Sequence, residues 1–159
     1  MKVIEINAST RKDGNTAQLL HVISDVLQSH GIETEQVQLS DAEKGFDALL
    51  QKMEQADGIL LGSPFYIEDA ATAMPGFLHY AAQTSAKKPL RHKVGAAVAA
   101  ARRGEGARAI GEMTQFFLKN EMFVAGTTCW NIAADAQAGL QNARNLAENM
   151  AFLLKKVNQ

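Results

Sequence analysis

The sequence holds little cysteine and almost no excess of charge of either sign. Cys129 is the single cysteine among 159 residues, so the chain cannot form an internal disulfide or supply a cysteine cluster or zinc framework. The 16 basic and 17 acidic residues leave a formal net charge of -1, and no overall basic field exists to drive nonspecific binding to nucleic acid. We therefore expect no nucleic-acid partner and no metal site.

Long hydrophobic runs are also missing. A secretory signal peptide needs an apolar stretch of about 7–15 residues, and Glu5 interrupts the first apolar stretch of this chain. No run approaches the ~18 consecutive apolar residues of a membrane-spanning helix. We therefore expect a cytoplasmic location and no membrane partner.

The length and composition are those of one globular domain covering residues 1–159. Domains most often contain about 100–150 residues. Apolar residues make up 47% of the chain and charged residues 21%, a mixture that excludes a disordered chain. No internal repeat, low-complexity tract or linker divides the sequence.

Short apolar runs alternate with helical patterns from one end of the chain to the other. Strands are predicted at 3–6, 33–39, 58–62, 94–101 and 122–125. Helices are predicted at 15–30, 46–53, 107–119 and 137–157, with a further one whose first turn contains Pro75. This alternation predicts an α/β fold with a doubly wound sheet. In such sheets ligands bind beyond the carboxyl ends of the strands, so the loops after the first, third and fourth strands are the candidate sites.

The loop after the first strand has the composition of a phosphate-binding loop. It joins the strand to a helix N-terminus, where free N–H groups and the helix dipole favour an anion. Ser9, Thr10 and Thr16 add hydroxyl groups, Asn15 adds an amide, and Arg11 can donate two hydrogen bonds to phosphate oxygens. The alternative is a plain capped turn in which Asn15 is the N-cap and Arg11 points into solvent.

The loop after the third strand, Pro64-Phe65-Tyr66-Ile67, places a rigid proline before two aromatic residues. At the carboxyl end of a buried strand, such a loop could flank a flat ring system. The alternative is that the two aromatic side chains only cover the end of the sheet.

These two loops together resemble those of the flavodoxin-like NAD(P)H-dependent FMN reductases, a group that includes quinone reductases and iron–sulfur flavoproteins. The matching motifs are Ser9-x-Arg11-x-x-Gly14-Asn15-Thr16 and Gly62-Ser63-Pro64-x-Tyr66. The resemblance implies five parallel strands in the order 2-1-3-4-5, with helices on both faces of the sheet. It also implies an FMN cofactor, with the phosphate held by Ser9, Thr10, Arg11, Asn15 and Thr16 and the flavin ring lined by Pro64, Phe65, Tyr66 and Ile67.

The loop after the fourth strand, Arg102-Arg103-Gly104-Glu105-Gly106, matches the glycine-rich loop that these reductases place near the flavin pyrimidine edge. The resemblance gives Arg103 and Gly104 to the cofactor site, where a cation would stabilise negative charge on reduced flavin. For Arg102 a solvated turn is the preferred interpretation. The segment after the second strand contains no cysteine, so no iron–sulfur cluster is expected.

The function implied by the resemblance is electron transfer from NAD(P)H through FMN to a quinone, a flavin or a similar small acceptor. Because the flavin performs this chemistry, no catalytic acid or base is assigned. Glu68 and Asp69 could repel an anionic nicotinamide cofactor, so two alternatives stay open: an FMN-binding electron-transfer module, and an interaction subunit that has lost the cofactor. Related proteins often assemble as homodimers or homotetramers, and we expect one of these.

Overall fold

The strands form one parallel sheet with the predicted order. The computed structural model describes residues 1–42, 45–64, 73–84, 88–100, 107–127 and 136–159. The sheet runs β2-β1-β3-β4-β5, and every adjacent pair is parallel. Its strands are β1 (Lys2–Asn7), β2 (Glu33–Gln38), β3 (Gly58–Pro64), β4 (Val94–Ala100) and β5 (Phe123–Val124). The flavodoxin-like α/β fold is therefore confirmed.

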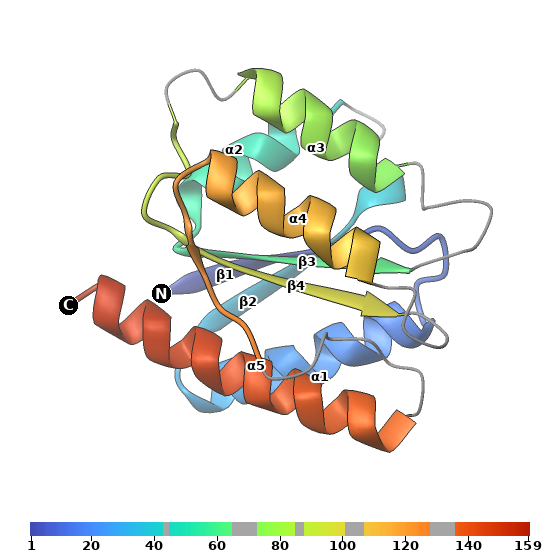
Figure 1. Cartoon of the computed structure of the whole chain (residues 1–159), viewed down its shortest axis with the longest axis vertical. Coiled ribbons are helices and arrows are strands. Elements are labelled where there is room, and N and C mark those ends of the chain that lie inside the picture. The colour runs from blue at the N-terminus through green and yellow to red at the C-terminus, as the bar shows by residue number, and fades with distance from the viewer. Residues whose placement is uncertain (43–44, 65–72, 85–87, 101–106, 128–135) are drawn as a thin grey trace.

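Helices cover both faces of the sheet, so the molecule has three layers (Figure 1). Helices α1 (Asn15–Ser29) and α5 (Ala136–Val157) pack together on one face. Helices α2 (Asp47–Gln55), α3 (Ala73–Thr84) and α4 (Ala107–Lys119) lie on the other face. A short 3₁₀ helix, η1 (Leu39–Asp41), follows β2.

The two-residue period of the strands divides the hydrophobic core into two parts. Successive side chains of a strand point to opposite faces, so Ile4 and Ile6 pack toward α2, α3 and α4, whereas Val3 packs toward α1 and α5. In β4, a Cβ on Gly95 would lie 2.7 Å from the ring of Phe117. The absence of a side chain there lets α4 pack directly against the sheet.

Some boundaries differ from those predicted. Strand β3 continues through Ser63 and Pro64, because both residues pair with β4; a proline is tolerated at a strand end, where a missing N–H breaks no ladder bond. Strand β5 contains two residues instead of four. Helix α1 ends at Ser29, with His30 as its C-cap, and Gly31 follows with a φ of 74°.

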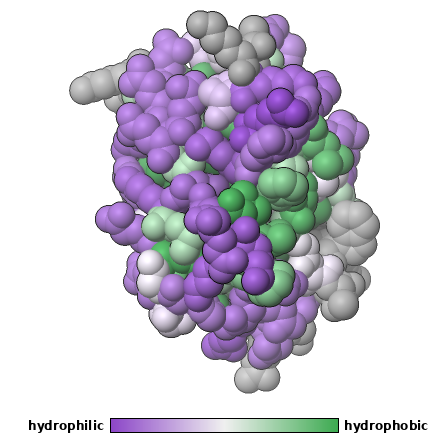
Figure 2. All heavy atoms as spheres, turned by 90° about the vertical axis from the view of Figure 1, so that its left-hand side faces the viewer, coloured by the Kyte–Doolittle hydropathy of each residue, from purple (hydrophilic) through white to green (hydrophobic). Residues whose placement is uncertain are grey.

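The loop between β1 and α1 and the two chain termini lie at opposite sides of the molecule. The segment between β1 and α1 lies at the right of Figure 1, and both termini lie at the left. Viewed from that left side, the surface is mainly hydrophilic and carries a smaller group of hydrophobic residues (Figure 2). Among the helices of the described ranges, none is long and apolar enough to cross a membrane.

Candidate functional site

The loop between β1 and α1 occupies the point where the order of the strands reverses. Strand β1 leads by a crossover to β2 on one side, and its other neighbour is β3. In doubly wound sheets the crossovers leave such a position in opposite directions, and ligands bind beyond the carboxyl ends of the strands there. The N–H of Ala8 donates a 2.8 Å hydrogen bond to the carbonyl oxygen of Gly62, so the start of the loop is attached to β3.

A chain of side-chain-to-backbone hydrogen bonds shapes this loop. The N–H of Ser9 donates to Oδ1 of Asn7 at 2.9 Å, and the N–H of Arg11 donates to Oγ of Ser9 at 3.1 Å. Each of these bonds closes a short turn of the Asx or Ser type. Asn7 and Ser9 are buried, whereas Thr10 and Arg11 are exposed. The two turns therefore present residues 10 and 11 at the surface of a fixed loop.

The end of β2 holds the same loop from the other side. The side-chain amide of Gln38 donates to the carbonyl oxygen of Ser9. Lys12 Nζ lies 2.8 Å from Oδ2 of Asp41 in η1, and this ion pair is exposed on both partners. Lys12 thereby lowers the pKa of Asp41 below its ordinary range. Three chain segments, from β1, β2 and η1, thus meet at the loop.

Helix α1 begins at the end of the loop with its first N–H groups directed toward it. Gly14 is the N-cap and makes no side-chain capping bond, so the expectation that Asn15 could be the N-cap is wrong: Asn15 and Thr16 form the first turn. Thr16 is buried, with its methyl group 3.1 Å from where a Cβ on Gly62 would lie. Gly62 therefore allows this first turn to approach the end of β3 closely.

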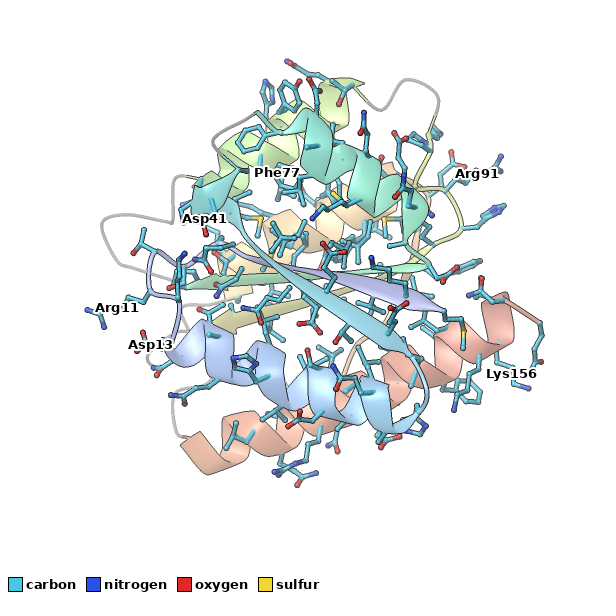
Figure 3. The ribbon with its side chains drawn as sticks, turned by 180° about the vertical axis from the view of Figure 1, so that it is seen from behind. Arg11, Asp13, Asp41, Phe77, Arg91 and Lys156 are labelled. Atoms are coloured by element: carbon cyan, nitrogen blue, oxygen red, sulfur yellow. The ribbon has the colours of Figure 1, made fainter. Side chains whose placement is uncertain are left out.

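The side chain of Arg11 is exposed and points away from the body of the molecule (Figure 3), as in the alternative in which it points into solvent. Figure 3 shows its side chain pointing outward at the edge that also carries Asp13 and Asp41. Within the described part of the chain Arg11 takes part in no salt bridge. A guanidinium group without an acidic partner can still donate two hydrogen bonds to an anion.

The residues of this loop fit a phosphate group. Phosphate oxygens accept hydrogen bonds from backbone N–H groups, hydroxyls and guanidinium groups. The loop offers the first turn of α1, which has no side-chain capping bond, the hydroxyls of Thr10 and Thr16, and the side chain of Arg11. The arrangement therefore suits the phosphate of a nucleotide such as FMN.

The structure brings together only part of the predicted site. Ser9, Thr10, Arg11, Asn15 and Thr16 share the loop and the first turn of α1, and Pro64 is buried at the end of β3, the next strand. The other predicted cofactor-binding residues lie outside the described part of the chain: Phe65, Tyr66, Ile67, Arg103 and Gly104.

Three contributors to this region were not predicted from the sequence. Gln38 and the Lys12–Asp41 pair support the loop from β2 and η1. Glu5 is fully buried in the middle of β1, and Ser24 Oγ of α1 donates a 2.6 Å hydrogen bond to its Oε1. The sequence carries a signal for the Glu5–Ser24 pair: a charged residue interrupts a β-branched strand, and a serine stands on the apolar face of the following helix.

Comparison with known proteins assigns the chain to a family. The sequence model of the family described as NADPH-dependent FMN reductase matches residues 1–137. The chain belongs to this family. An iron-sulfur flavoprotein of Methanocaldococcus jannaschii is 31% identical over an alignment of 193 positions that covers 100% of both chains. An iron-sulfur flavoprotein of Methanosarcina thermophila is 24% identical over 187 residues, covering 100% of this chain and 98% of the relative.

A solved structure supports the same fold. A flavodoxin from the domain Archaea superposes with a TM-score of 0.74 at 19% identity, and the match covers 100% of both chains. At this identity the likeness concerns the fold alone. Family membership and the flavodoxin-like fold together make the chain a flavin-dependent oxidoreductase that uses FMN.

The iron–sulfur part of the relatives' names belongs to those proteins. This chain contains one cysteine, whereas iron–sulfur clusters are usually held by four. The residues with described positions include no group of three or more His, Cys, Asp or Glu that could hold a metal ion.

Proposed function

We propose that this chain is an FMN-dependent oxidoreductase that takes electrons from NAD(P)H and passes them to a quinone, a flavin or a similar small acceptor. The observation that carries the proposal is the loop between β1 and α1, in which two hydrogen-bonded turns expose Arg11 just before a helix N-terminus that has no side-chain capping bond. The family description names NADPH and FMN, which supports the choice of donor and cofactor. When bound, FMN supplies the redox chemistry.

In this proposal the protein residues bind and orient the cofactor. Arg11 and Thr10 would contact the phosphate from the surface of the loop, and Asn15 and Thr16 would contact it from the first turn of α1. Ser9 is buried, and its hydroxyl accepts the N–H of Arg11, so we assign Ser9 mainly to holding the loop in shape. Pro64 ends β3 one strand away, where residues 65–67 would begin the wall beside the flavin ring.

We also propose that the chain works as a homodimer or homotetramer in the cytoplasm. The side chains of Leu118 and Phe152 are each 61% exposed, and Phe123 is 45% exposed. Large exposed apolar side chains can contact a second copy of the chain, although only a contiguous patch of them marks an interaction site. Light scattering coupled to size-exclusion chromatography tests the proposal, and a monomer at working concentrations would reject it.

Two measurements separate the proposed enzyme from its alternatives. The purified protein is first titrated with FMN while the flavin absorbance near ~450 nm is followed. It is then mixed with NADH or NADPH and a quinone, and nicotinamide oxidation is recorded. The proposed enzyme binds FMN and turns over. An electron-transfer module binds FMN without turnover, and a subunit that has lost the cofactor does neither.

A further inference from the structure

Glu5 is a carboxyl group enclosed in the layer between the sheet and α1. Its residue exposure is 0%, and Ser24 is the one described residue that gives it a hydrogen bond, to Oε1. Its second oxygen, Oε2, is buried and has no hydrogen-bond partner among the described residues. The described lysines, arginines and histidines form no ion pair with Glu5. A carboxylate at this position would carry an uncompensated charge, which is costly in a buried environment.

Asn7 lies two residues further along β1, so its side chain points to the same face of the sheet as that of Glu5. Its Oδ1 accepts the N–H of Ser9, while its Nδ2 is buried and has no partner in the part of the chain that the structure describes. An acceptor on Glu5 and a donor on Asn7 therefore both lack a described partner on the same face of one strand. Asn7 is also the first member of the hydrogen-bond chain that continues through Ser9 to Arg11. The buried carboxyl group therefore shares a strand face with Asn7, the residue whose side chain holds the start of the phosphate loop.

The groups around Glu5 do not offset its charge. Its partner in β2 is Gln36 and its partner in β3 is Leu60, and both are uncharged. The two titratable residues of α1 are His21 and Asp25, both exposed, and Asp25 acts on Glu5 as a like charge. The side of α5 packed against this layer is apolar, with these buried residues: Ala143, Leu146, Ala147, Met150, Ala151 and Leu154.

Burial is the main cause that raises the pKa of Glu5, to about 7, and the Ser24 hydrogen bond acts in the opposite direction. Glu5 therefore changes charge in the range where the protein would work. A negative charge in a region of low dielectric constant repels a phosphate bound at the neighbouring loop. The loop is held by the Asn7 and Gln38 contacts, which limits any movement that would relieve this repulsion.

We propose that Glu5 tunes the phosphate loop, so that an uncharged Glu5 permits tight binding of a phosphate dianion and a charged Glu5 weakens it. The inference rests on the proposed FMN site. Coupling between two sites is reciprocal, so binding of the FMN phosphate makes Glu5 hold its proton more strongly. FMN binding is then accompanied by proton uptake at neutral pH.

The test compares FMN affinities of the wild type and Glu5→Gln between pH 6 and pH 8.5, measured by isothermal titration calorimetry. The FMN phosphate gains its second charge near pH 6, an effect common to both proteins, so the ratio of their affinities isolates Glu5. We expect the variant to bind FMN about fivefold more tightly than the wild type at pH 8.5 and equally tightly at pH 6. A fivefold effect is at the low end of typical coupling between two sites. Riboflavin, which lacks the phosphate, should show no such difference.

Ser24→Ala supplies an independent measurement. It removes the hydrogen bond that favours the charged form of Glu5, so the pH at which the FMN affinity of the wild type declines should move upward. This variant also carries the test if Glu5→Gln does not fold, as judged by near-ultraviolet circular dichroism. An affinity ratio that does not change with pH, an unmoved midpoint in Ser24→Ala, or an equal effect on riboflavin would each overturn the inference. Absence of FMN binding at every pH would overturn the proposed function as well.

Discussion

Ser24 and Glu5 connect α1 to the middle of β1 through a buried hydrogen bond of 2.6 Å. Burial raises the pKa of the Glu5 carboxyl from an ordinary 4.5 to about 7. Between these two pH values the folded protein keeps a proton that the unfolded chain releases. The contribution of Glu5 to stability is therefore fully present below pH 4.5 and is lost as the pH rises through about 7.

Glu5→Gln should remove this pH dependence. A pKa difference of this size corresponds to about 3 kcal/mol. Urea unfolding of the apoprotein at pH 4.5 and pH 8 measures this difference. The free energy of unfolding of the variant minus that of the wild type should be larger at pH 8 than at pH 4.5 by about that amount. A constant difference between the two proteins at both pH values would show that Glu5 does not titrate in this range.

The Lys12–Asp41 ion pair holds a cation and a carboxylate beside the phosphate loop. Asp41→Asn removes the carboxylate and releases Lys12, so the local potential becomes more favourable for an anion. We expect FMN affinity to rise about two- to threefold at low salt, with a smaller gain at high salt, because exposed charges are screened.

Asp47→Asn is the matched control for this change. Asp47 is exposed at the start of α2, where its Oδ1 accepts a hydrogen bond from Tyr80. The same loss of one negative charge at that position should leave FMN affinity within the error of the measurement. An equal gain in both variants would mean that net charge alone, and not the position of Asp41, controls binding.

Gly95 marks the closest approach of α4 to the sheet. An alanine Cβ would lie 2.7 Å from the Phe117 ring, so Gly95→Ala should lower the free energy of unfolding by about 1–3 kcal/mol, the usual cost of overpacking a core. A Cβ added to Gly111 in α4 would meet no atom within 4 Å, and Gly111→Ala should raise stability by about 0.5–1 kcal/mol. Chemical denaturation of both variants checks this prediction, and equal destabilisation would contradict it.

Much of the fold was predictable because the pattern of short apolar runs and helical periods is regular. The run Gly58–Gly62 predicted a buried central strand, and β3 is buried along its whole length. Residues 94–101 are rich in alanine, which favours helix, yet their place in the alternation predicted a strand, and β4 occupies 94–100. Small side chains suit this strand because α4 packs closely over Gly95.

The candidate site was predicted less completely, because contacts between distant segments leave no trace in local sequence. The loop motif identified Arg11 and Thr16, but nothing near Gln38 predicts that its amide donates to the carbonyl oxygen of Ser9. The same is true of Asp41, which meets Lys12 only because η1 follows β2 at the edge of the sheet. Glu5 and Ser24 differ in this respect, because a charged residue within an apolar strand and a serine on the apolar face of a helix are visible in the sequence.

Arg11→Ala tests most directly whether the loop between β1 and α1 binds the phosphate of FMN. FMN and riboflavin dissociation constants are measured for the wild type, Arg11→Ala and the control Arg91→Ala, whose arginine lies on the opposite side of the molecule and pairs with Glu121 (Figure 3). A charged hydrogen bond contributes about 1.5–3 kcal/mol. We therefore predict that Arg11→Ala weakens FMN binding about tenfold or more and leaves riboflavin binding unchanged, with no effect of Arg91→Ala. Equal loss of both ligands, or no loss of FMN affinity, would contradict a phosphate site at this loop.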